Sequence, residues 1–136
     1  WNSPAISSRG KVFAADRLPA FVAIRAGIPV GHVTYSLEHD GCEVVTLSST
    51  LERAGVGAAL LAAVEAEALR AGARRLFLTT TNDNLNALGF YQRRGWRLSA
   101  LHKEGMNRAR ARKPEIPRMG LNRIPLRDEL ELELAL

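Results

Sequence analysis

The alternation of hydrophobic and polar residues predicts that the chain begins as a set of antiparallel strands. The apolar run at 21–25 and the alternating run at 31–37 are separated by a Gly-Ile-Pro turn, which predicts a hairpin. An Asp-Gly turn follows, and residues 42–48 have the composition of a third strand. Residues 1–20 contain two prolines and a glycine as breakers, and we predict that they are irregular.

In the second half of the chain the pattern changes to helices that alternate with strands. Apolar residues at helical spacing predict a helix over 55–72 that ends at a glycine, and the apolar run within 75–80 predicts a buried strand. A second helix is predicted over 84–94 and another strand over 96–102. A helix between two strands indicates a parallel crossover for the central strands.

The last third of the chain combines an irregular segment with a strongly patterned one. Residues 103–127 form a long excursion rich in proline and arginine, whereas residues 129–134 alternate strictly between Glu and Leu. That alternation predicts a strand with one buried face, which could also pair with another subunit in a homodimer. The predicted fold class is α+β, with helices packed on a mixed, mostly antiparallel twisted sheet, in a single domain over residues 1–136.

The composition of the chain indicates the class of protein and the compartment to expect. Hydrophobic residues make up 46% of the chain and charged residues 24%, which is ordinary for a globular protein. No apolar run approaches the ~20 residues that a membrane-spanning helix needs, and no signal-peptide pattern opens the sequence. The single cysteine, Cys42, fits a reducing compartment, so we expect a cytoplasmic location. Acidic neighbours raise the pKa of its thiol, which argues against a nucleophile.

The net charge of +5 favours an anionic partner. A nucleic acid, a membrane surface and a polyphosphate cofactor are the three classes that such a charge attracts. Much of the excess lies within or beside the excursion, in Arg108, Arg110, Arg112, Lys113, Arg118 and Arg123. Arginines at every second position spread around a helix, and aromatic residues are not interleaved with them, which argues against stacking on bases. A basic nucleic-acid-binding module nevertheless stays open as an alternative function.

A turn punctuated by glycines is the clearest candidate for a binding site. Gly55 and Gly57 run directly into the predicted helix, straight after a strand. The unpaired N–H groups at a helix start, together with the positive end of the helix dipole, bind anions, and above all a diphosphate. Glycines let the backbone approach the anion closely. The Gly-Lys-Ser/Thr of a Walker loop is missing, and a dinucleotide fingerprint would need Gly or Ala at Leu60.

The helix at 84–94 carries a second motif, and with the glycine turn it resembles the GNAT superfamily of acyl-CoA-dependent N-acetyltransferases. Members carry Q/R-x-x-G-x-G/A at a helix start and, about thirty residues later, Asn-x-x-Ala-x-x-Phe-Tyr-x-x-x-Gly-Phe/Trp. The second motif is matched in full by Asn84, Ala87, Phe90, Tyr91, Gly95 and Trp96. The resemblance covers roughly residues 20–102.

The first motif departs from the family pattern. Glu52 stands where Gln or Arg is usual, and Arg53 and Ala54 stand where a glycine and a basic or polar residue are usual. A carboxylate beside a diphosphate is unfavourable, although Arg53 compensates for it. The family's first strand and helix are also not found in this sequence. A catalytically inactive relative that binds CoA is therefore a second alternative.

The resemblance implies a site for acetyl-CoA as co-substrate, with no metal. Two splayed strands would hold the pantetheine arm, and backbone groups of the glycine turn would hold the pyrophosphate. The implied cofactor-binding residues are Leu47, Ser49, Arg53, Ala54, Gly55, Val56, Gly57, Ala58, Asn84 and Tyr91.

The resemblance also implies the catalytic groups. Tyr91 would be the general acid that protonates the CoA thiolate, because a phenol stays protonated at pH 7. Glu43 is the candidate general base, with Glu38, His39 and His102 as rivals, whereas His32 is expected to be structural. The acceptor would be a primary amine, either a small molecule or a peptide. Its identity, and any preference for an anionic amine, stay open.

Overall fold

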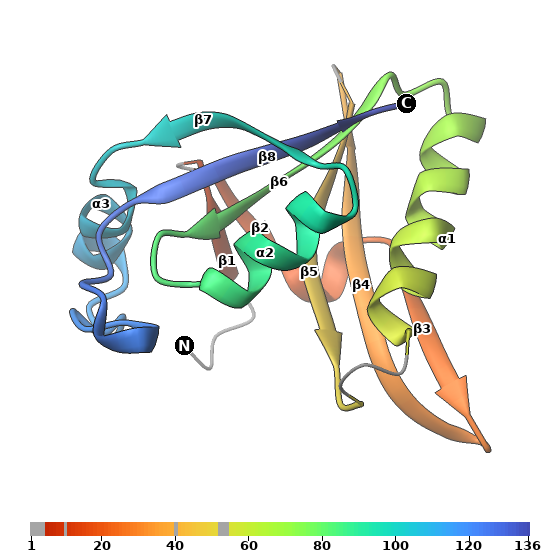
Figure 1. Cartoon of the computed structure of the whole chain (residues 1–136), viewed down its shortest axis with the longest axis horizontal. Helices are drawn as coiled ribbons and strands as arrows, with labels where there is room; N and C mark the ends of the chain where they lie inside the picture. The colour runs from red at the N-terminus through yellow and green to blue at the C-terminus, as the bar shows by residue number, and fades with distance from the viewer. Residues whose placement is uncertain (1–4, 10, 40, 52–54) are drawn as a thin grey trace. The chain divides into compact units, whose positions relative to one another are not determined.

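The chain divides into two compact units in the computed structural model, which describes residues 5–9, 11–39, 41–51 and 55–136 (Figure 1). Unit 1 consists of residues 1–14 and 78–134, and unit 2 of residues 15–77 and 135–136. The strands have the hydrogen-bonded order β3-β4-β5-β6-β8-β7, and β1 and β2 form a separate pair. The mixed sheet with helices confirms the predicted α+β fold class.

Unit 2 begins with the predicted antiparallel strands. They are β3 (Ala20–Arg25), β4 (Ile28–Glu38) and β5 (Gly41–Ser49), preceded by a short 3-10 helix (Ala15–Arg17). The first turn differs from the prediction, because Ile28 and Pro29 already pair with Arg25 and Ile24. Ala26 and Gly27 alone form the turn, with φ of 51° and 79°, as a two-residue hairpin of the primed type requires.

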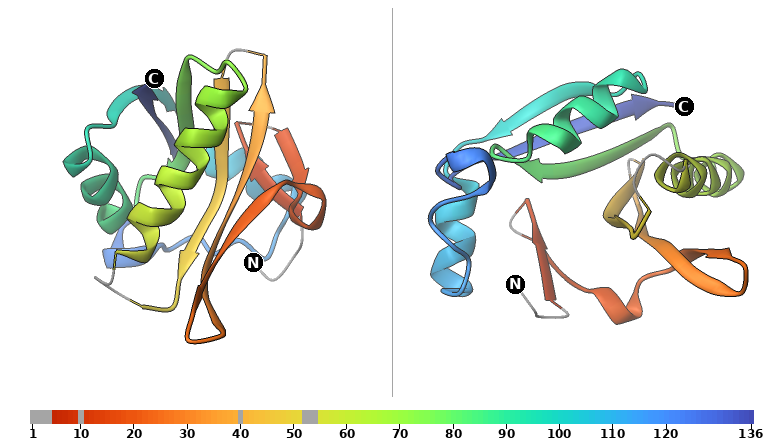
Figure 2. Two further views of the ribbon diagram at one scale, coloured as in Figure 1. Left: turned by 90° about the vertical axis from the view of Figure 1, so that its right-hand side faces the viewer. Right: turned by 60° about the horizontal axis from the view of Figure 1, so that its bottom comes forward.

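Helix α1 (Val56–Arg70) connects β5 to β6 (Arg75–Thr81), as the predicted crossover requires. The two strands are parallel, with Cys42 opposite Leu76 and Glu43 opposite Phe77. The helix packs along strands β3 to β5 through one apolar face (Figure 2). That face consists of Leu60, Leu61, Val64 and Ala68, which are all buried. Spacing of three and four residues explains why a single stripe of the helix faces the strands.

The carboxyl end of α1 is closed by the glycine that the sequence predicted. Gly72 has φ of +85°, the Gly72 N–H donates to Leu69 O (3.0 Å), and the Ala73 N–H donates to Ala68 O (2.9 Å). This pair of bonds is the Schellman arrangement, which satisfies two carbonyl groups that the helix leaves unpaired. The chain can therefore reverse direction within a few residues and enter β6.

Unit 1 contains the second predicted helix and the last strands. Helix α2 (Leu85–Arg93) precedes β7 (Arg97–His102), and β7 pairs antiparallel with β8 (Glu129–Ala135). Within this unit α2 lies over one face of the strands, and the β1–β2 pair lies over the other (Figure 2). β8 has β6 and β7 as neighbours in the strand order. The prediction that β8 could pair with a second subunit is therefore wrong, since neither of its edges is free.

The predicted irregular start of the chain is also wrong. β1 (Ala5–Ser8) and β2 (Lys11–Ala14) form an antiparallel pair, with Ala5 opposite Ala14 and Ser8 opposite Lys11. Strands of four residues are too short to show a period, and their pairing depends on contacts made elsewhere in the fold. The breakers in the sequence did not exclude strands from this segment.

The excursion at 103–127 contains a helix that the sequence analysis missed, α3 (Gly105–Arg112), and a 3-10 turn (Leu121–Arg123). Met106 and Ala109 lie three residues apart on α3 and are buried together with Ile116 and Leu126. This small cluster holds α3 against the rest of the excursion. The helix carries good helix formers, but its one apolar pair is weaker than the stripe of α1.

Arg110 fixes the path of the excursion after α3. Its guanidinium donates to the carbonyl oxygens of Ile116 (3.0 Å), Pro117 (2.8 Å) and Leu126 (2.7 Å) and to Asn107 Oδ1 (2.8 Å). Carbonyl groups outside helices and sheets need such donors when water cannot reach them. Arg110 is thus a structural residue, and it contributes little to the basic surface that the sequence suggested.

The last strand corrects a further prediction, because both of its faces are covered. Leu132 is fully buried, yet Glu129 and Glu131 are also only 5% and 9% exposed. Arg9 and His102 approach Glu131, at 4.0 Å from Arg9 Nε and 3.4 Å from His102 Nε2 to Glu131 Oε1. The Glu face is covered by side chains that are remote in sequence, so alternation alone could not reveal its burial.

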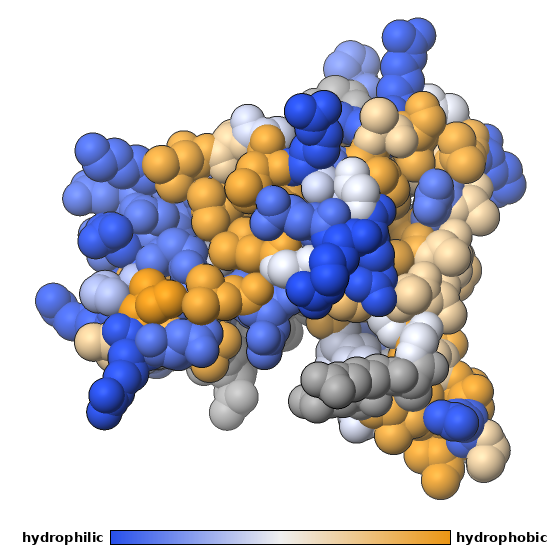
Figure 3. Space-filling model, viewed as in Figure 1, coloured by the Kyte–Doolittle hydropathy of each residue, from blue (hydrophilic) through white to orange (hydrophobic). Residues whose placement is uncertain are grey.

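The tip of one hairpin exposes apolar side chains. The hairpin of β3 and β4 exposes Ile24 (66%) and Ile28 (63%) at its tip, seen as apolar surface at the lower right of Figure 3. Scattered exposed apolar side chains are normal on a protein surface. In the part of the chain that the structure describes, no helix is long and apolar enough to cross a membrane.

Two glycine substitutions should change stability in opposite directions. Gly72→Ala should lower the free energy of unfolding by about 1 kcal/mol, because alanine is strained at positive φ. Gly89→Ala should raise it by about 0.5 kcal/mol, because Gly89 lies inside α2, where a Cβ would meet only the flexible end of Arg93. Urea unfolding of both variants measures this. Equal effects of the two substitutions would contradict the assignment of Gly72 as the helix terminator.

Candidate functional site

The start of α1 presents backbone donors without a partner in the helix. Gly55 is the N-cap residue, with φ of 76° and ψ of 7°, and it has no side chain that could cap the helix. The first bond of the helix runs from the Ala59 N–H to Gly55 O at 3.0 Å. The N–H groups of Val56, Gly57 and Ala58 precede that bond and have no partner within the helix. They lie at the positive end of the helix dipole, which favours an anion.

The local sequence explains this geometry. Gly55 adopts a left-handed conformation that other residues adopt only with strain, and the first turn of α1 contains no acidic side chain. The other predicted residues of the glycine turn, Arg53 and Ala54, lie outside the described residues, as does Glu52. Within the described residues, the backbone at positions 55–58 has the geometry that the predicted anion site requires, and the site itself stays a prediction.

The carboxyl end of β5 lies beside this helix start in the sequence and belongs to the same unit. Ser49 Oγ donates to Leu51 O (2.9 Å) and accepts from the Leu51 N–H (3.2 Å), so its hydroxyl stabilises the turn after the strand. Leu47 is half-buried opposite Val33 of β4. The predicted divergence of β5 and β6 beyond Phe77 involves residues of both units and stays a prediction.

Glu43 and Cys42 lie side by side in sequence at the buried start of β5. Glu43 is 1% exposed, opposite Ser36 on β4 and Phe77 on β6. Burial, together with the nearby carboxylates of Glu38, Glu43 and Glu67, raises the pKa of the Cys42 thiol to about 11. The expectation that acidic neighbours raise the pKa of Cys42 is confirmed, and this thiol is no nucleophile at neutral pH.

In unit 1, α2 carries the two polar residues of the second motif. Asn84 is the N-cap of the helix, and its Oδ1 accepts a hydrogen bond from the Ala87 N–H (3.1 Å). Asparagine is among the best N-cap residues, so Asn84 has a structural role of its own. With Oδ1 engaged in the cap, the Nδ2 group is the part of the amide that could donate to a ligand.

Tyr91 lies near the end of α2 in an aromatic cluster. The side chain is 7% exposed and contacts Phe90 and Trp96 edge-on, with ring centroids 5.1 and 5.2 Å apart. Burial raises the pKa of Tyr91 to about 12, although the positive charge of Arg94 opposes the shift. The phenol is therefore protonated over the whole physiological range.

The spacing of the second motif has a structural cause. Gly95 has φ of +90°, the Trp96 N–H donates to Tyr91 O (3.1 Å), and the Gly95 N–H donates to Gln92 O (3.0 Å). This is the Schellman arrangement again, and the Trp96–Tyr91 ring contact is the apolar contact that accompanies it. The glycine and the tryptophan thus fix the last turn of α2, on which Tyr91 stands.

The loop between β6 and α2 contains polar residues that the sequence analysis missed. Asn82 Oδ1 accepts from the N–H groups of Arg127 (3.0 Å) and Asp128 (2.9 Å). Asp83, 4% exposed, accepts from the Leu121 N–H at 2.7 Å. These bonds tie the start of α2 to the excursion. The only signal in the sequence is a run of Asn and Asp after a strand, which by itself predicts just a turn.

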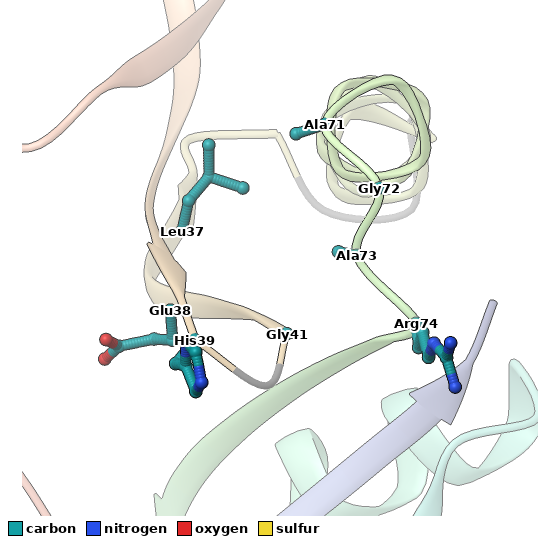
Figure 4. A pocket seen from close by; sticks show the side chains of 8 residues that line it. All are labelled: Leu37, Glu38, His39, Gly41, Ala71, Gly72, Ala73 and Arg74. Atoms are coloured by element: carbon teal, nitrogen blue, oxygen red, sulfur yellow. The ribbon is translucent and has the colours of Figure 1, made fainter.

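Two of the rival bases, Glu38 and His39, lie in unit 2 near the carboxyl end of α1. Glu38 and His39 line a cavity of about 230 Å³ that also contacts residues 71–74, where α1 has ended (Figure 4). A helix of 15 residues is about 22 Å long, so this cavity is about that far from Gly55. Gly41, two residues before Glu43 on β5, lines the same cavity, so distance from Gly55 does not distinguish Glu43 from Glu38 or His39 as a base. His102 belongs to unit 1 and contacts Glu131, and His32 is exposed on β4.

Among the described residues, no group of three His, Cys, Asp or Glu side chains is placed to hold a metal ion. The donors at 55–58 are N–H groups, which bind anions and not cations.

Comparison with known proteins yields a family and a fold. A family model described as acetyltransferase (GNAT) matches residues 3–96. Two proteins of Bacillus subtilis (strain 168), named uncharacterized proteins YdhI and YxbD, are each 40% identical to this chain, over 96% and 97% of it and 82% and 84% of their own length. The crystal structure of a Bacillus subtilis acetyltransferase in complex with CoA has a TM-score of 0.78 at 22% identity, covering 89% of this chain and 78% of that one.

The burial of Cys42 leads to a test of its chemistry. A shift of the thiol pKa from 9.0 to about 11 lowers the thiolate fraction at pH 8 roughly a hundredfold. The folded protein should therefore react with an iodoacetamide-type reagent at least about a hundredfold more slowly than the same protein in urea. Mass spectrometry of timed samples measures this, with Cys42→Ser as the blank. Equal rates in the folded and unfolded states would show that Cys42 is accessible and activated.

Proposed function

The chain belongs to the GNAT acetyltransferase family, and we propose on this premise that residues 1–136 form one domain that transfers the acetyl group of acetyl-CoA to a primary amine. The observation that carries the proposal is the start of α1, where Gly55 leaves three backbone N–H groups without a helix partner. Such a donor set suits the diphosphate of CoA. The family match includes this segment and the second motif on α2.

The cofactor would be held mainly by backbone groups. In this proposal the N–H groups of residues 53–58 bind the pyrophosphate, and the backbone of Leu47 and Ser49 binds the pantetheine amide and the thioester carbonyl. Asn84 would donate from Nδ2 to the cofactor arm, which is consistent with the engagement of its Oδ1 in the helix cap. Binding through the backbone tolerates the departures at Glu52 and Arg53, because the donors do not depend on the side chains.

The reaction begins when the neutral amine attacks the carbonyl carbon of the thioester with its lone pair. A tetrahedral intermediate forms, and a backbone N–H at the end of β5 would stabilise its oxyanion. The intermediate collapses as the C–S bond breaks and the electron pair leaves with sulfur. The products are the acetylated amine and the CoA thiolate, and one proton has to leave nitrogen while another reaches sulfur.

Two side chains would move these protons. Tyr91 would donate its hydroxyl proton to the CoA thiolate, and its raised pKa of about 12 keeps that proton in place at neutral pH. Glu43 would accept the proton of the amine, directly or through water, from its buried position on β5. These two transfers leave the sum of charges unchanged. The resting state returns when Glu43 releases its proton to solvent and the Tyr91 phenolate takes a proton up.

A charge placed at the start of α1 tests the cofactor site. Gly57→Glu should weaken the binding of acetyl-CoA by about a hundredfold or more, because a carboxylate there repels the diphosphate. The same carboxylate is favourable for the helix dipole, so the fold should persist. Calorimetric titration measures the dissociation constant, with Ala62→Glu, at an exposed position of the same helix, as the matched control. Unchanged binding by Gly57→Glu would exclude this site.

The chain contains two tyrosines, which provide a matched test of the general acid. Tyr91→Phe should lower kcat about a hundredfold, the usual contribution of general acid catalysis, while the Kd of acetyl-CoA stays the same. Tyr35→Phe is the control, since Tyr35 is a buried tyrosine stacked on Phe21 in unit 2. Release of the CoA thiol with an accepted amine is the readout. Full activity of Tyr91→Phe would exclude Tyr91 as the general acid. If the wild-type protein binds CoA but shows no turnover with any amine, the alternative of a catalytically inactive CoA-binding relative is favoured.

A further inference from the structure

Strand β6 ends in three consecutive threonines, and one of them carries a buried hydroxyl group without a partner. The three are Thr79, Thr80 and Thr81. The Thr81 hydroxyl donates a hydrogen bond to Asp83 Oδ1. The Thr79 hydroxyl oxygen is buried, and among the described residues no hydrogen-bond partner lies within reach of it. Thr79 as a whole is half-buried, so its face of the strand is not sealed from a ligand.

A buried hydroxyl without a partner is unfavourable for the folded chain. Its hydrogen bonds to water have been lost on folding, and no bond within the chain replaces them. Buried polar groups in proteins are nearly always paired, so an exception points to a ligand or a bound water. Thr34 on β4 shows the ordinary case, since it is 7% exposed and its Oγ1 is paired with Thr46 Oγ1 at 2.6 Å. The Thr79 hydroxyl is therefore a candidate contact for a ligand.

Neighbouring side chains identify the face of β6 from which Thr79 projects. Residues two apart on a strand share a face, and the Arg75 guanidinium accordingly lies over the Phe77 ring, 4.3 Å from its centroid. Thr79 is the next residue of that series. A Cβ at Gly41 would lie 2.9 Å from Arg75 Cγ and 3.5 Å from Phe77 Cδ1, so Gly41 on β5 faces the same side.

Glu43 projects from the corresponding face of β5. It is the register partner of Phe77 in the parallel pair of β5 and β6, and register partners point to the same side of a sheet. It also lies two residues after Gly41. In the proposed function Glu43 accepts the proton of the amine, so the amine has to reach this face. Thr79 thus belongs to the strand face at which the acceptor would react.

The chemistry of an amine suits this hydroxyl. At neutral pH a primary amine arrives mainly as an ammonium group, which has three N–H donors and no acceptor. Each N–H group needs an acceptor once water is removed. A threonine hydroxyl offers lone pairs and carries no charge, so it can hold the nitrogen both before and after the proton leaves.

We propose that Thr79 binds the acceptor substrate, and that its hydroxyl oxygen accepts an N–H of the amine that attacks acetyl-CoA. This bond restricts the orientation of the amine and leaves the nitrogen lone pair for the thioester carbon. It also provides the partner that the described part of the chain does not give to the hydroxyl. The inference rests on the proposed function, which requires an amine acceptor.

Variants that differ by one hydroxyl test the inference. Thr79→Val should raise KM for an accepted amine about tenfold or more, while the Kd of acetyl-CoA stays the same. Thr79→Ser, which keeps the hydroxyl, should have a KM close to that of the wild type. Thr80→Val, on the opposite face of the same strand, is the matched control and should leave KM unchanged. Benzylamine, spermidine, lysine and glycylglycine are the amines, and release of the CoA thiol is the readout.

Three results of these assays would overturn the inference. The first is a KM of Thr79→Val equal to that of Thr80→Val. The second is weaker binding of acetyl-CoA by Thr79→Val, because the hydroxyl would then belong to the cofactor site. The third is an equal rise of KM in Thr79→Ser and Thr79→Val, because packing of the methyl group would then be the cause.

The stability of the variants tests the missing partner without any substrate. Thr34→Val removes a hydroxyl that is paired with Thr46, so it should lower the urea midpoint of unfolding. Thr79→Val removes an unpaired hydroxyl, so its midpoint should equal or exceed that of the wild type. Equal losses in the two variants would show that the chain or a bound water already pairs the Thr79 hydroxyl, and would overturn the inference.

The same measurements separate this inference from the proposed function. A wild-type protein that turns over none of the amines would contradict the proposed function, and the inference that rests on it would fall as well. Turnover by the wild type with an unchanged KM in Thr79→Val would overturn the inference alone and leave the proposed function in place.

Discussion

Positive φ angles at three glycines are the constraint on which both units depend. Gly55 begins α1 with φ of 76°, Gly72 ends it with φ of 85°, and Gly95 ends α2 with φ of 90°. A side chain at these positions would clash with the backbone in the left-handed region. Each glycine therefore fixes where a helix begins or ends, and with it the place of the next strand. At Gly55 the same constraint leaves the donors that the proposed cofactor site uses.

The second motif shows how folding and chemistry are combined in one segment. Asn84 caps the start of α2, and Gly95 and Trp96 close its end over Tyr91. Asn84, Gly95 and Trp96 therefore have structural roles that involve no ligand. The Tyr91 hydroxyl has no such structural role in the helix. Removal of this hydroxyl is therefore the most informative test of catalysis. The burial that raises its pKa is a consequence of the same packing.

Much of the fold could be predicted from the sequence, because most elements carry a clear period or terminator. The strands at 21–25 and 42–48 and both predicted helices lie within one or two residues of the observed bounds. The errors arose where the local pattern is weak or where burial comes from distant residues. β1 and β2 are too short to show a period, and the covered Glu face of β8 depends on side chains far away in the chain. The donors at 55–58 were predictable from local sequence. The contact of Arg9 with Glu129 could not be predicted in this way, because 120 residues separate the two.

In the proposed function, the N–H groups at the start of α1 bind the diphosphate of CoA. Amide NMR during titration tests it most directly, because each N–H reports separately. We expect the amide protons of Val56, Gly57 and Ala58 to shift downfield on addition of acetyl-CoA, because hydrogen bonds to phosphate oxygens form. Pantetheine, which lacks the diphosphate, should leave them unchanged. Saturable binding of acetyl-CoA without a shift at these three amides would contradict the account.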